Sequence, residues 1–328
     1  MLKTLSSSFL LTALSFSSFA ADKVNFQLDW LPGGDKAPVY VGIDRGMFEK
    51  YDLEVSINQG RGSTEAITKL ATGISDVGIA DISALLVAKA TNDIAVSAVF
   101  SQFSQAPHAY FIVDDGSVNS FADVKGKKVA TSPFTSSNLY LPLILNQSGL
   151  TEDDIQLVKA DPGALGPMLV TGNTDVVISW LTSKDRLISQ AKQAGKTLKV
   201  MPWHEAGLEQ YATAVIASDR FLAERPDVAK RFLAAYAEAV EYTWANPTES
   251  AESIHKIVPE VDVQVAKDTI SSIHNLVYNP ISDASGVGQF DPKHLASTWK
   301  WTSAAQGIDE NSFDPETALN RGFVLEAK

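Results

Sequence analysis

The chain has 328 residues, and 45% of them are apolar, which excludes a disordered polymer and allows about two domains with sizeable cores. Its 39 acidic and 27 basic residues give a net charge of −12, which argues against nucleic-acid binding. No cysteine occurs, which excludes disulfides, thiolate metal ligands, a cysteine nucleophile and a lipid anchor on a cysteine.

Residues 1–21 are typical of an export signal. Lys3 is their only charge, an apolar run begins at Phe9, and small residues stand at the expected cleavage point near Ala20 and Ala21. That run is too short to span a bilayer, and no later segment approaches about twenty apolar residues. We therefore expect a soluble, monomeric protein in the periplasm of a two-membrane bacterium.

The region after the signal alternates between strand and helix patterns. Its first strand pattern, 26–30, alternates apolar and polar residues and ends in a Gly-rich turn at 31–35. The next strand runs into a second such turn, 60–64, where Ser63 or Thr64 is expected to cap a helix. The expected strands are 26–30, 53–57, 77–80 and 94–100, and the expected helices are 39–48, 64–72 and 82–90.

An internal repeat links two parts of the chain. Residues 70–79 and 169–178 share Leu, Thr, Gly, Asp, Val and Ile at matching places. Both segments predict a helix end, a Gly stop, an Asp turn and a buried strand. Such turns are common, so chance similarity is one interpretation, and two lobes of related topology is the sharper one.

The rest of the chain predicts a second lobe and a helical tail. Because the tail is expected to pack back on the first lobe, the chain crosses between lobes twice, and a hinged cleft between lobes is a favoured ligand site. The prediction is an α/β fold with one lobe from 22–105 and 202–328 and the other from 106–201. The expected strands are 110–113, 124–131, 155–158, 176–179, 198–201 and 211–217, and the expected helices are 137–146, 166–170, 183–194, 229–245, 251–257, 263–276, 292–305 and 315–321.

The turns after the strands supply the first candidate ligand contacts, because helix N-termini there offer unpaired N–H groups. Trp30 can stack on a planar ligand or can be a core residue. Asp29 can accept a hydrogen bond from a ligand amine or can bond its own turn. If both turns face the cleft, Lys36 and Arg61 favour a carboxylate, sulfonate or phosphate, although long basic side chains usually point to solvent.

The second lobe offers matching candidates. Asp81 and Trp180 stand at equivalent strand ends of the repeat, so we expect them to face each other across the cleft; a helix N-cap and a core residue are the simpler alternatives. Ser63 and Thr64 can cap their helix, and capping is compatible with ligand contact. At a helix start of the second lobe, Thr135, Ser136 and Asn138 are expected to meet the ligand, with Phe134 as an aromatic wall. Asp161 can bind a ligand cation or cap the next turn. Weaker candidates near the crossings are Phe103, His108, Trp203 and Tyr211.

No metal, cofactor or reactive constellation is expected. No GxSxG, P-loop or HExxH pattern occurs. The remaining histidines lack metal-ligand spacing: His204, His255, His274 and His294.

Several short segments together are distinctive: LDWLP (28–32), VYVG (39–42), GMFE (46–49), LEV (53–55), GRGS (60–63) and GISDVG (73–78). In this combination the chain, over about residues 24–245, resembles the periplasmic substrate-binding proteins of ABC importers. The branch in question includes sulfonate-, nitrate- and thiamine-precursor-binding proteins and is named after the yeast enzyme of thiamine-pyrimidine synthesis.

The resemblance implies a type II binding-protein fold, in which a ligand is trapped between two α/β lobes and presented to an inner-membrane permease with its ATPase. In pyrimidine-binding relatives an Asp-Trp-x-Pro stretch, here 29–32, offers an aromatic face, and a histidine often follows where this chain has Lys36. The implied function is solute binding without chemistry. The alternatives are a sensor that binds and signals, and a pyrimidine-metabolising enzyme, which is associated with a cysteine-rich iron-binding motif absent here.

The ligand is expected to combine a ring with an acidic group. Aromatic residues at the candidate site favour the ring, and the basic residues Lys36 and Arg61 favour the acidic group. An aromatic or heteroaromatic anion is therefore the first expectation, a pyrimidine precursor of thiamine the second, and a small alkanesulfonate the third.

Overall fold

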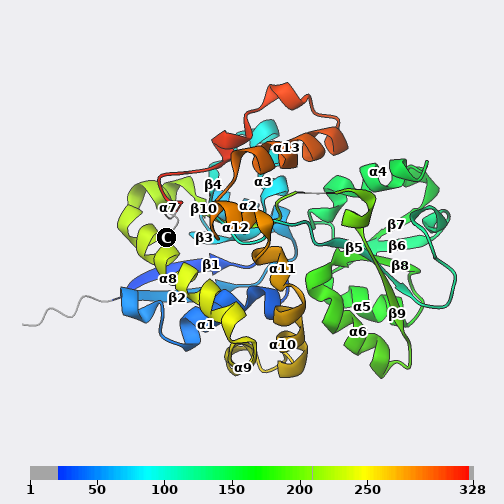
Figure 1. Ribbon diagram of the computed structural model, residues 1–328, viewed down its shortest axis with the longest axis horizontal. Coiled ribbons are helices and arrows are strands. Elements are labelled where there is room, and N and C mark those ends of the chain that lie inside the picture. The colour runs from blue at the N-terminus through cyan, green and yellow to red at the C-terminus, as the bar shows by residue number, and fades with distance from the viewer. Residues whose placement is uncertain (1–20, 209, 325–328) are drawn as a thin grey trace, which may run out of the picture.

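The computed structural model describes residues 21–208 and 210–324. The expected export signal lies outside the described residues, apart from Ala21. The chain forms two α/β lobes side by side, each built on one five-stranded sheet with helices against it (Figure 1).

The sheet of the first lobe combines four strands from the first part of the chain with one strand that returns later. Three neighbouring strands are parallel, and β10 lies antiparallel between β3 and β4. The order across the sheet is β2-β1-β3-β10-β4. The bounds are β1 (Asp22–Gln27), β2 (Leu53–Asn58), β3 (Val77–Asp81), β4 (Val96–Ser101) and β10 (Thr213–Ser218).

The sheet of the second lobe has the same design, with the order β7-β6-β8-β5-β9. Here β5 is the antiparallel strand, and it lies between β8 and β9. The bounds are β5 (His108–Val113), β6 (Lys128–Thr131), β7 (Gln156–Lys159), β8 (Val176–Trp180) and β9 (Leu198–Pro202). In each sheet the antiparallel strand is the first strand after the chain enters that lobe from the other one.

The internal repeat falls on equivalent strands of the two sheets. Residues 70–79 run from the end of α2 into β3, and residues 169–178 run from the end of α5 into β8. Both strands are third in their sheet, beside the antiparallel strand. The structure thus confirms the interpretation of the repeat as related topology.

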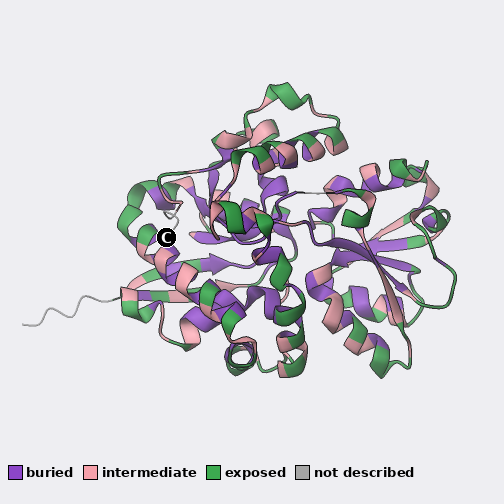
Figure 2. Ribbon diagram, viewed as in Figure 1, coloured by how far each residue is buried: buried purple, intermediate pink, exposed green. Residues whose placement is uncertain are grey.

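Helices cover both sheets, and the buried apolar residues form four clusters. The strands are largely buried, whereas the helices carry both buried and exposed residues (Figure 2). Those of the first part of the chain are α1 (Ala37–Asp44), α2 (Ser63–Ala71), α3 (Ile82–Asn92), α4 (Ser137–Gln147), α5 (Pro162–Val170) and α6 (Lys184–Gln193). Those of the tail are α7 (Asp219–Glu224), α8 (Pro226–Ala245), α9 (Pro247–Ile257), α10 (Val263–Ser272), α11 (His274–Val277), α12 (Pro280–Ser285) and α13 (Pro292–Gln306).

Several expected elements differ from the observed ones. Strand β1 covers Asp22–Gln27 instead of 26–30, and the Gln27 side-chain amide lies within hydrogen-bond distance of the carbonyls of Leu28, Asn58 and Gln59. Gly62, with no side-chain hydrogen bond, takes the N-cap of α2 that was expected for Ser63 or Thr64. The expected helix 263–276 divides at Ile273, and 315–321 contains only the 3-10 turn Pro315–Ala318.

The tail helices contact both lobes rather than the first lobe alone. Helices α8 and α9 pack on α1 of the first lobe. Helix α13 lies against α3 of the first lobe and α4 of the second. Its Trp299 belongs to an apolar cluster of the first lobe, and its Trp301 packs on a cluster of the second.

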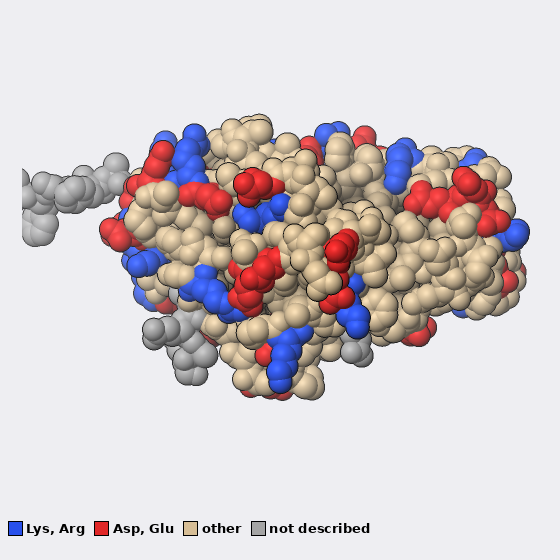
Figure 3. All heavy atoms as spheres, turned by 90° about the horizontal axis from the view of Figure 1, so that it is seen from above, with Lys and Arg blue, Asp and Glu red and all other residues tan. Residues whose placement is uncertain are grey.

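Acidic and basic side chains lie interspersed on the face that Figure 3 shows. Among the described residues, no helix combines the length and the apolar character that crossing a membrane needs.

Candidate functional site

A narrow pocket lies between the two lobes. The first lobe contributes the turn after β1 and the start of α2, and the second contributes the residue before the α4 cap and the segment from the end of β8 to α6. Strand ends and helix starts from both sheets therefore converge, as expected for ligand sites in such sheets. The lining residues are Asp29, Trp30, Asp35, Lys36, Gly62, Ser63, Thr135, Ser179, Trp180, Thr182 and Ser183.

Asp29, Asp35 and Lys36 of the first lobe form a buried ionic triad that lines the pocket. The Lys36 ammonium Nζ lies 2.6 Å from the Asp29 carboxylate and 2.9 Å from that of Asp35. Burial by itself would lower the pKa of Lys36, but the two carboxylates outweigh it and raise that pKa above its usual value. Lys36 is therefore a cation whose charge is already matched inside the protein.

Two tryptophans present indole N–H groups near the pocket. Trp180 ends β8 and is 9% exposed, and Trp30 packs on the apolar cluster of the second lobe although it belongs to the first. The indole Nε1 atoms of both are buried and have no hydrogen-bond partner among the described residues. Because a buried donor without a partner costs free energy, a ligand acceptor there would be favoured.

Hydroxyl groups surround the same space. The Ser63 hydroxyl accepts a hydrogen bond from the backbone N–H of Asp81 at 3.0 Å and lies 3.5 Å from an Asp29 oxygen, to which it donates. Thr135 and Ser179 add hydroxyls from the second lobe. The arrangement can hold a planar polar molecule through stacking and hydrogen bonds.

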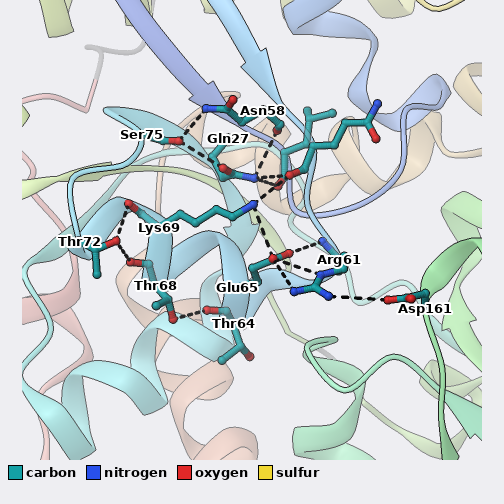
Figure 4. Close-up of polar contacts among 12 residues, drawn as sticks. Gln27, Asn58, Arg61, Thr64, Glu65, Thr68, Lys69, Thr72, Ser75 and Asp161 are labelled. Atoms are coloured by element: carbon teal, nitrogen blue, oxygen red, sulfur yellow. Dashed lines mark hydrogen bonds and ion pairs between the residues drawn. The ribbon is translucent and has the colours of Figure 1, made fainter.

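Arg61 lies at the rim, outside the pocket lining. Its guanidinium pairs with Glu65 at 3.0 Å, lies 4.8 Å from the Phe134 ring centroid, and reaches within 3.9 Å of Asp161 in the second lobe (Figure 4). The side-chain hydrogen bond with Glu65 raises the pKa of Arg61. Nearby, the Phe134 carbonyl accepts from the Thr64 backbone N–H at 3.2 Å. These residues join the two lobes rather than surround the pocket.

The other predicted residues do not line the pocket. Asp81 caps α3 by accepting from the Ser83 backbone N–H at 2.9 Å, which is the simpler of the two roles considered for it. Ser136 and Asp161 occupy N-cap positions without side-chain cap hydrogen bonds, and Asn138 bonds Thr131 and Ser132 within its own lobe. Three of the weaker candidates are buried in cores: Phe103, Trp203 and Tyr211.

His108 links Asp81 with Trp180. The His108 Nε2 atom lies 3.5 Å from an Asp81 oxygen, and its ring centroid lies 5.5 Å from that of Trp180. Its Nδ1 lies 2.9 Å from the Ser137 hydroxyl, and the Gln210 amide lies 3.3 Å from Nε2. The two strand ends of the repeat are thus connected through a buried histidine rather than by direct contact.

This connection is sensitive to protonation. Burial raises the pKa of Asp81 to about 6, against the lowering effect of hydrogen bonds from Ser136 and Ser83. Burial also lowers the pKa of His108 to about 3. Both side chains are therefore neutral between these two values.

An Asp81→Asn variant should change how stability depends on pH. The folded-state pKa of Asp81 is raised from 3.8 to about 6, so its stabilising contribution is complete below the lower value and is lost as the pH rises through the upper one. Relative to wild type, the variant should gain about 3 kcal/mol between pH 4 and pH 8. Urea unfolding across this range measures the difference.

The pKa of His108 shifts in the opposite direction, which determines how the free energy of unfolding varies with pH. Its pKa falls from 6.5 to about 3, so its contribution is present above the higher value and is lost as the pH falls through the lower one. The two slopes nearly cancel in wild type between pH 4 and 6, whereas the variant should become more stable as the pH rises. Parallel curves for both proteins would contradict the buried, neutral pair.

Among the described residues, no group of three or more His, Asp or Glu side chains is placed to hold a metal ion. Sequence reasoning missed several lining residues, namely Asp35, Gly62, Ser179, Thr182 and Ser183. The last two follow Trp180 after one residue, Leu181, so the end of strand β8 was the signal that pointed to them.

The chain is similar in sequence to proteins from a bacterium and a yeast. Over 248 residues it is 27% identical to a putative thiamine biosynthesis protein of Haemophilus influenzae, covering 75% of this chain and 77% of that protein. Over 241 residues it is 24% identical to a 4-amino-5-hydroxymethyl-2-methylpyrimidine phosphate synthase of Candida albicans, with 70% of each chain covered.

The structure is similar to that of the alkanesulfonate-binding protein SsuA from Xanthomonas axonopodis pv. citri bound to MOPS. The TM-score is 0.71 at 14% identity, covering 92% of this chain and 98% of that one, which shows a shared periplasmic binding protein fold. The family model described as NMT1/THI5 like matches residues 34–250. Because that match spans more than half of the 328 residues, the chain belongs to the NMT1/THI5-like family.

Proposed function

We propose that the protein is the extracytoplasmic solute-binding component of an ABC importer. A small ring-bearing molecule is held between the lobe of residues 22–105 with 202–328 and the lobe of residues 106–201, and the closed form is delivered to an inner-membrane permease with its ATPase. The single observation that carries the proposal is the inter-lobe pocket with two buried indole N–H groups that find no hydrogen-bond partner in the described part of the chain. The fold and the periplasmic relatives support the same function.

The charges at the pocket favour a different ligand from the one that the sequence suggests. With all three groups ionised, Asp29, Asp35 and Lys36 carry one net negative charge, because two carboxylates enclose one ammonium. Arg61 pairs with Glu65 and is exposed at the rim. The inner pocket therefore suits a ring that carries amino or N–H donors, and a small alkanesulfonate becomes a poorer candidate.

The direct test is native mass spectrometry of the protein purified from the periplasm, followed by denaturation and identification of any released molecule. Calorimetric titration with 4-amino-5-hydroxymethyl-2-methylpyrimidine tests the ring class. Binding of a ring compound without turnover is the expected result. The proposal fails if broad screening of small molecules, including that compound, yields no binding.

A Trp30→Ala variant should bind the ring compound more weakly by about 1–3 kcal/mol, because it loses both the stacking surface and the indole donor. A Trp30→Phe variant keeps an aromatic face and loses only the donor, so its affinity should lie between those of Ala and wild type. Calorimetry on the three proteins measures the difference. An unchanged dissociation constant in the Ala variant would remove Trp30 from the site.

The second candidate function is synthesis or conversion of a pyrimidine, which the name of the Candida albicans relative favours. The chain has no cysteine, so no thiolate can bind a metal or act as a nucleophile. Conversion of a bound pyrimidine, followed by mass spectrometry of the products, would favour the enzyme over the carrier.

A further inference from the structure

Arg186 is a half-buried cation that forms no hydrogen bond or ion pair among the described residues. It lies in the first turn of α6 in the second lobe, beside Asp185, whose carboxylate accepts a hydrogen bond from the Ser272 hydroxyl at 2.9 Å. Arg186 itself makes no hydrogen bond or ion pair with any described residue. Burial lowers the pKa of the Arg186 guanidinium, and the charge of Asp35 only partly opposes this effect. The guanidinium therefore loses water contacts without gaining a contacting counter-ion among the described residues.

The side chain lines an outer hollow between the lobes, which is wider than the inner pocket. This hollow shares Trp30, Asp35, Thr182 and Ser183 with the inner pocket, so the two spaces adjoin along one edge. A ring held at Trp30 can consequently extend a substituent from the inner pocket toward α6.

The charges around the outer hollow leave Arg186 as the available cation. The acidic side chains that line it are Asp35, Glu260 and Asp262. Asp35 pairs with Lys36 at 2.9 Å, Asp262 accepts from the Val265 backbone N–H at 2.9 Å, and Glu260 is exposed at the rim. Among the described lining residues, Arg186 is the one Lys or Arg side chain.

Two hydroxyl groups stand between the inner pocket and the outer hollow. Thr182 and Ser183 are buried, line both spaces, and make no side-chain hydrogen bond with any described residue. They directly precede α6, whose unpaired N–H groups add positive potential at the same place. The guanidinium fork and these hydroxyls together match the oxygens of a carboxylate or phosphate.

We propose that Arg186 is a specificity-determining residue that receives an anionic oxygen group, carboxylate or phosphate, carried by the ring-bearing ligand. The inference rests on the proposed function, because it assigns the outer part of the same ligand. The acidic group expected from the sequence is then bound by a residue of the second lobe, and not by Lys36 or Arg61.

The test uses matched pairs of ligands that differ only in the anionic group. One pair is 4-amino-5-hydroxymethyl-2-methylpyrimidine and its phosphate ester, and a panel of aromatic amides with the corresponding carboxylates supplies the others. Calorimetry on the full chain should show that the anionic member of at least one pair binds roughly tenfold or more tightly than the neutral member. Arg186→Gln should abolish this preference and leave the neutral member within about twofold.

Two further variants make the result specific. Arg186→Lys keeps the charge but not the fork, so part of the preference should remain. Lys192→Gln removes one positive charge from an exposed position on the same helix and should leave both affinities unchanged. Thermal unfolding of each variant verifies that it is folded.

The outcomes separate the two proposals. Binding of the neutral members with no anion preference in wild type, or an equal loss for both members in Arg186→Gln, overturns the role of Arg186 and leaves the carrier function standing. Absence of binding for every pair overturns both. A preference for phosphate over carboxylate, or the reverse, identifies the kind of anion.

Discussion

A Lys36→Met variant should have a free energy of unfolding about 3–5 kcal/mol lower than that of wild type. The reason is the ionic triad: Asp29 and Asp35 are 3% and 5% exposed, and removal of the ammonium leaves two buried carboxylates close together without a counter-charge. Urea unfolding at neutral pH, followed by circular dichroism, measures the loss.

The loss should depend on pH in a defined direction. Burial raises the folded-state pKa of Asp29, and loss of the Lys36 ammonium raises it further, so the variant is most stable at low pH and loses stability as the pH rises through that pKa. The deficit relative to wild type should therefore shrink on acidification. A deficit that stays constant with pH would indicate lost packing rather than lost charge compensation.

Lys50→Met is the matched control for this experiment. Lys50 also pairs with a carboxylate, that of Glu238 at 3.0 Å, but its side chain is 63% exposed. An exposed pair contributes little, so the unfolding midpoint should stay close to that of wild type. Equal losses for the two variants would show that burial of the triad is not what makes Lys36 important.

A Gly62→Ala variant should weaken ligand binding roughly a hundredfold or more by preventing closure of the two lobes. A Cβ atom at Gly62 would lie 2.1 Å from the backbone carbonyl oxygen of Phe134 in the opposite lobe, and the residue also has φ +157°. Backbone atoms cannot move aside as a flexible side chain can, so the lobes would have to separate. The measurements are calorimetry and the radius of gyration from small-angle X-ray scattering with and without ligand.

Gly172→Ala separates the collision from backbone strain. Gly172 has φ +73°, which also disfavours alanine, but a Cβ atom there would meet no heavy atom within 4 Å. This variant should lose stability and keep both its affinity and its ligand-induced compaction. If Gly62→Ala compacts on ligand addition as wild type does, the contact between Gly62 and Phe134 does not limit closure.

Most strands and helices could be predicted from the sequence, because local residue patterns reflect local structure. Apolar alternation and Gly stops located most strands and helices, and the repeat at 70–79 and 169–178 identified two equivalent strands. The first strand was expected at 26–30 but covers Asp22–Gln27, because the alternation of apolar and polar residues continues past the strand into the turn. Apolar alternation alone does not mark where a strand ends.

The sequence by itself determined the lobes, the family pattern and the turns that approach the pocket. Only the tertiary structure decided what the charges do, because the effect of a charged group depends on its burial and on the partner it meets. Lys36 meets two carboxylates, Arg61 meets Glu65, and Arg186 meets none among the described residues. A helical sequence does not specify which face lies against the other lobe, so Arg186 was not recognisable as a residue of the cleft until the two lobes were assembled.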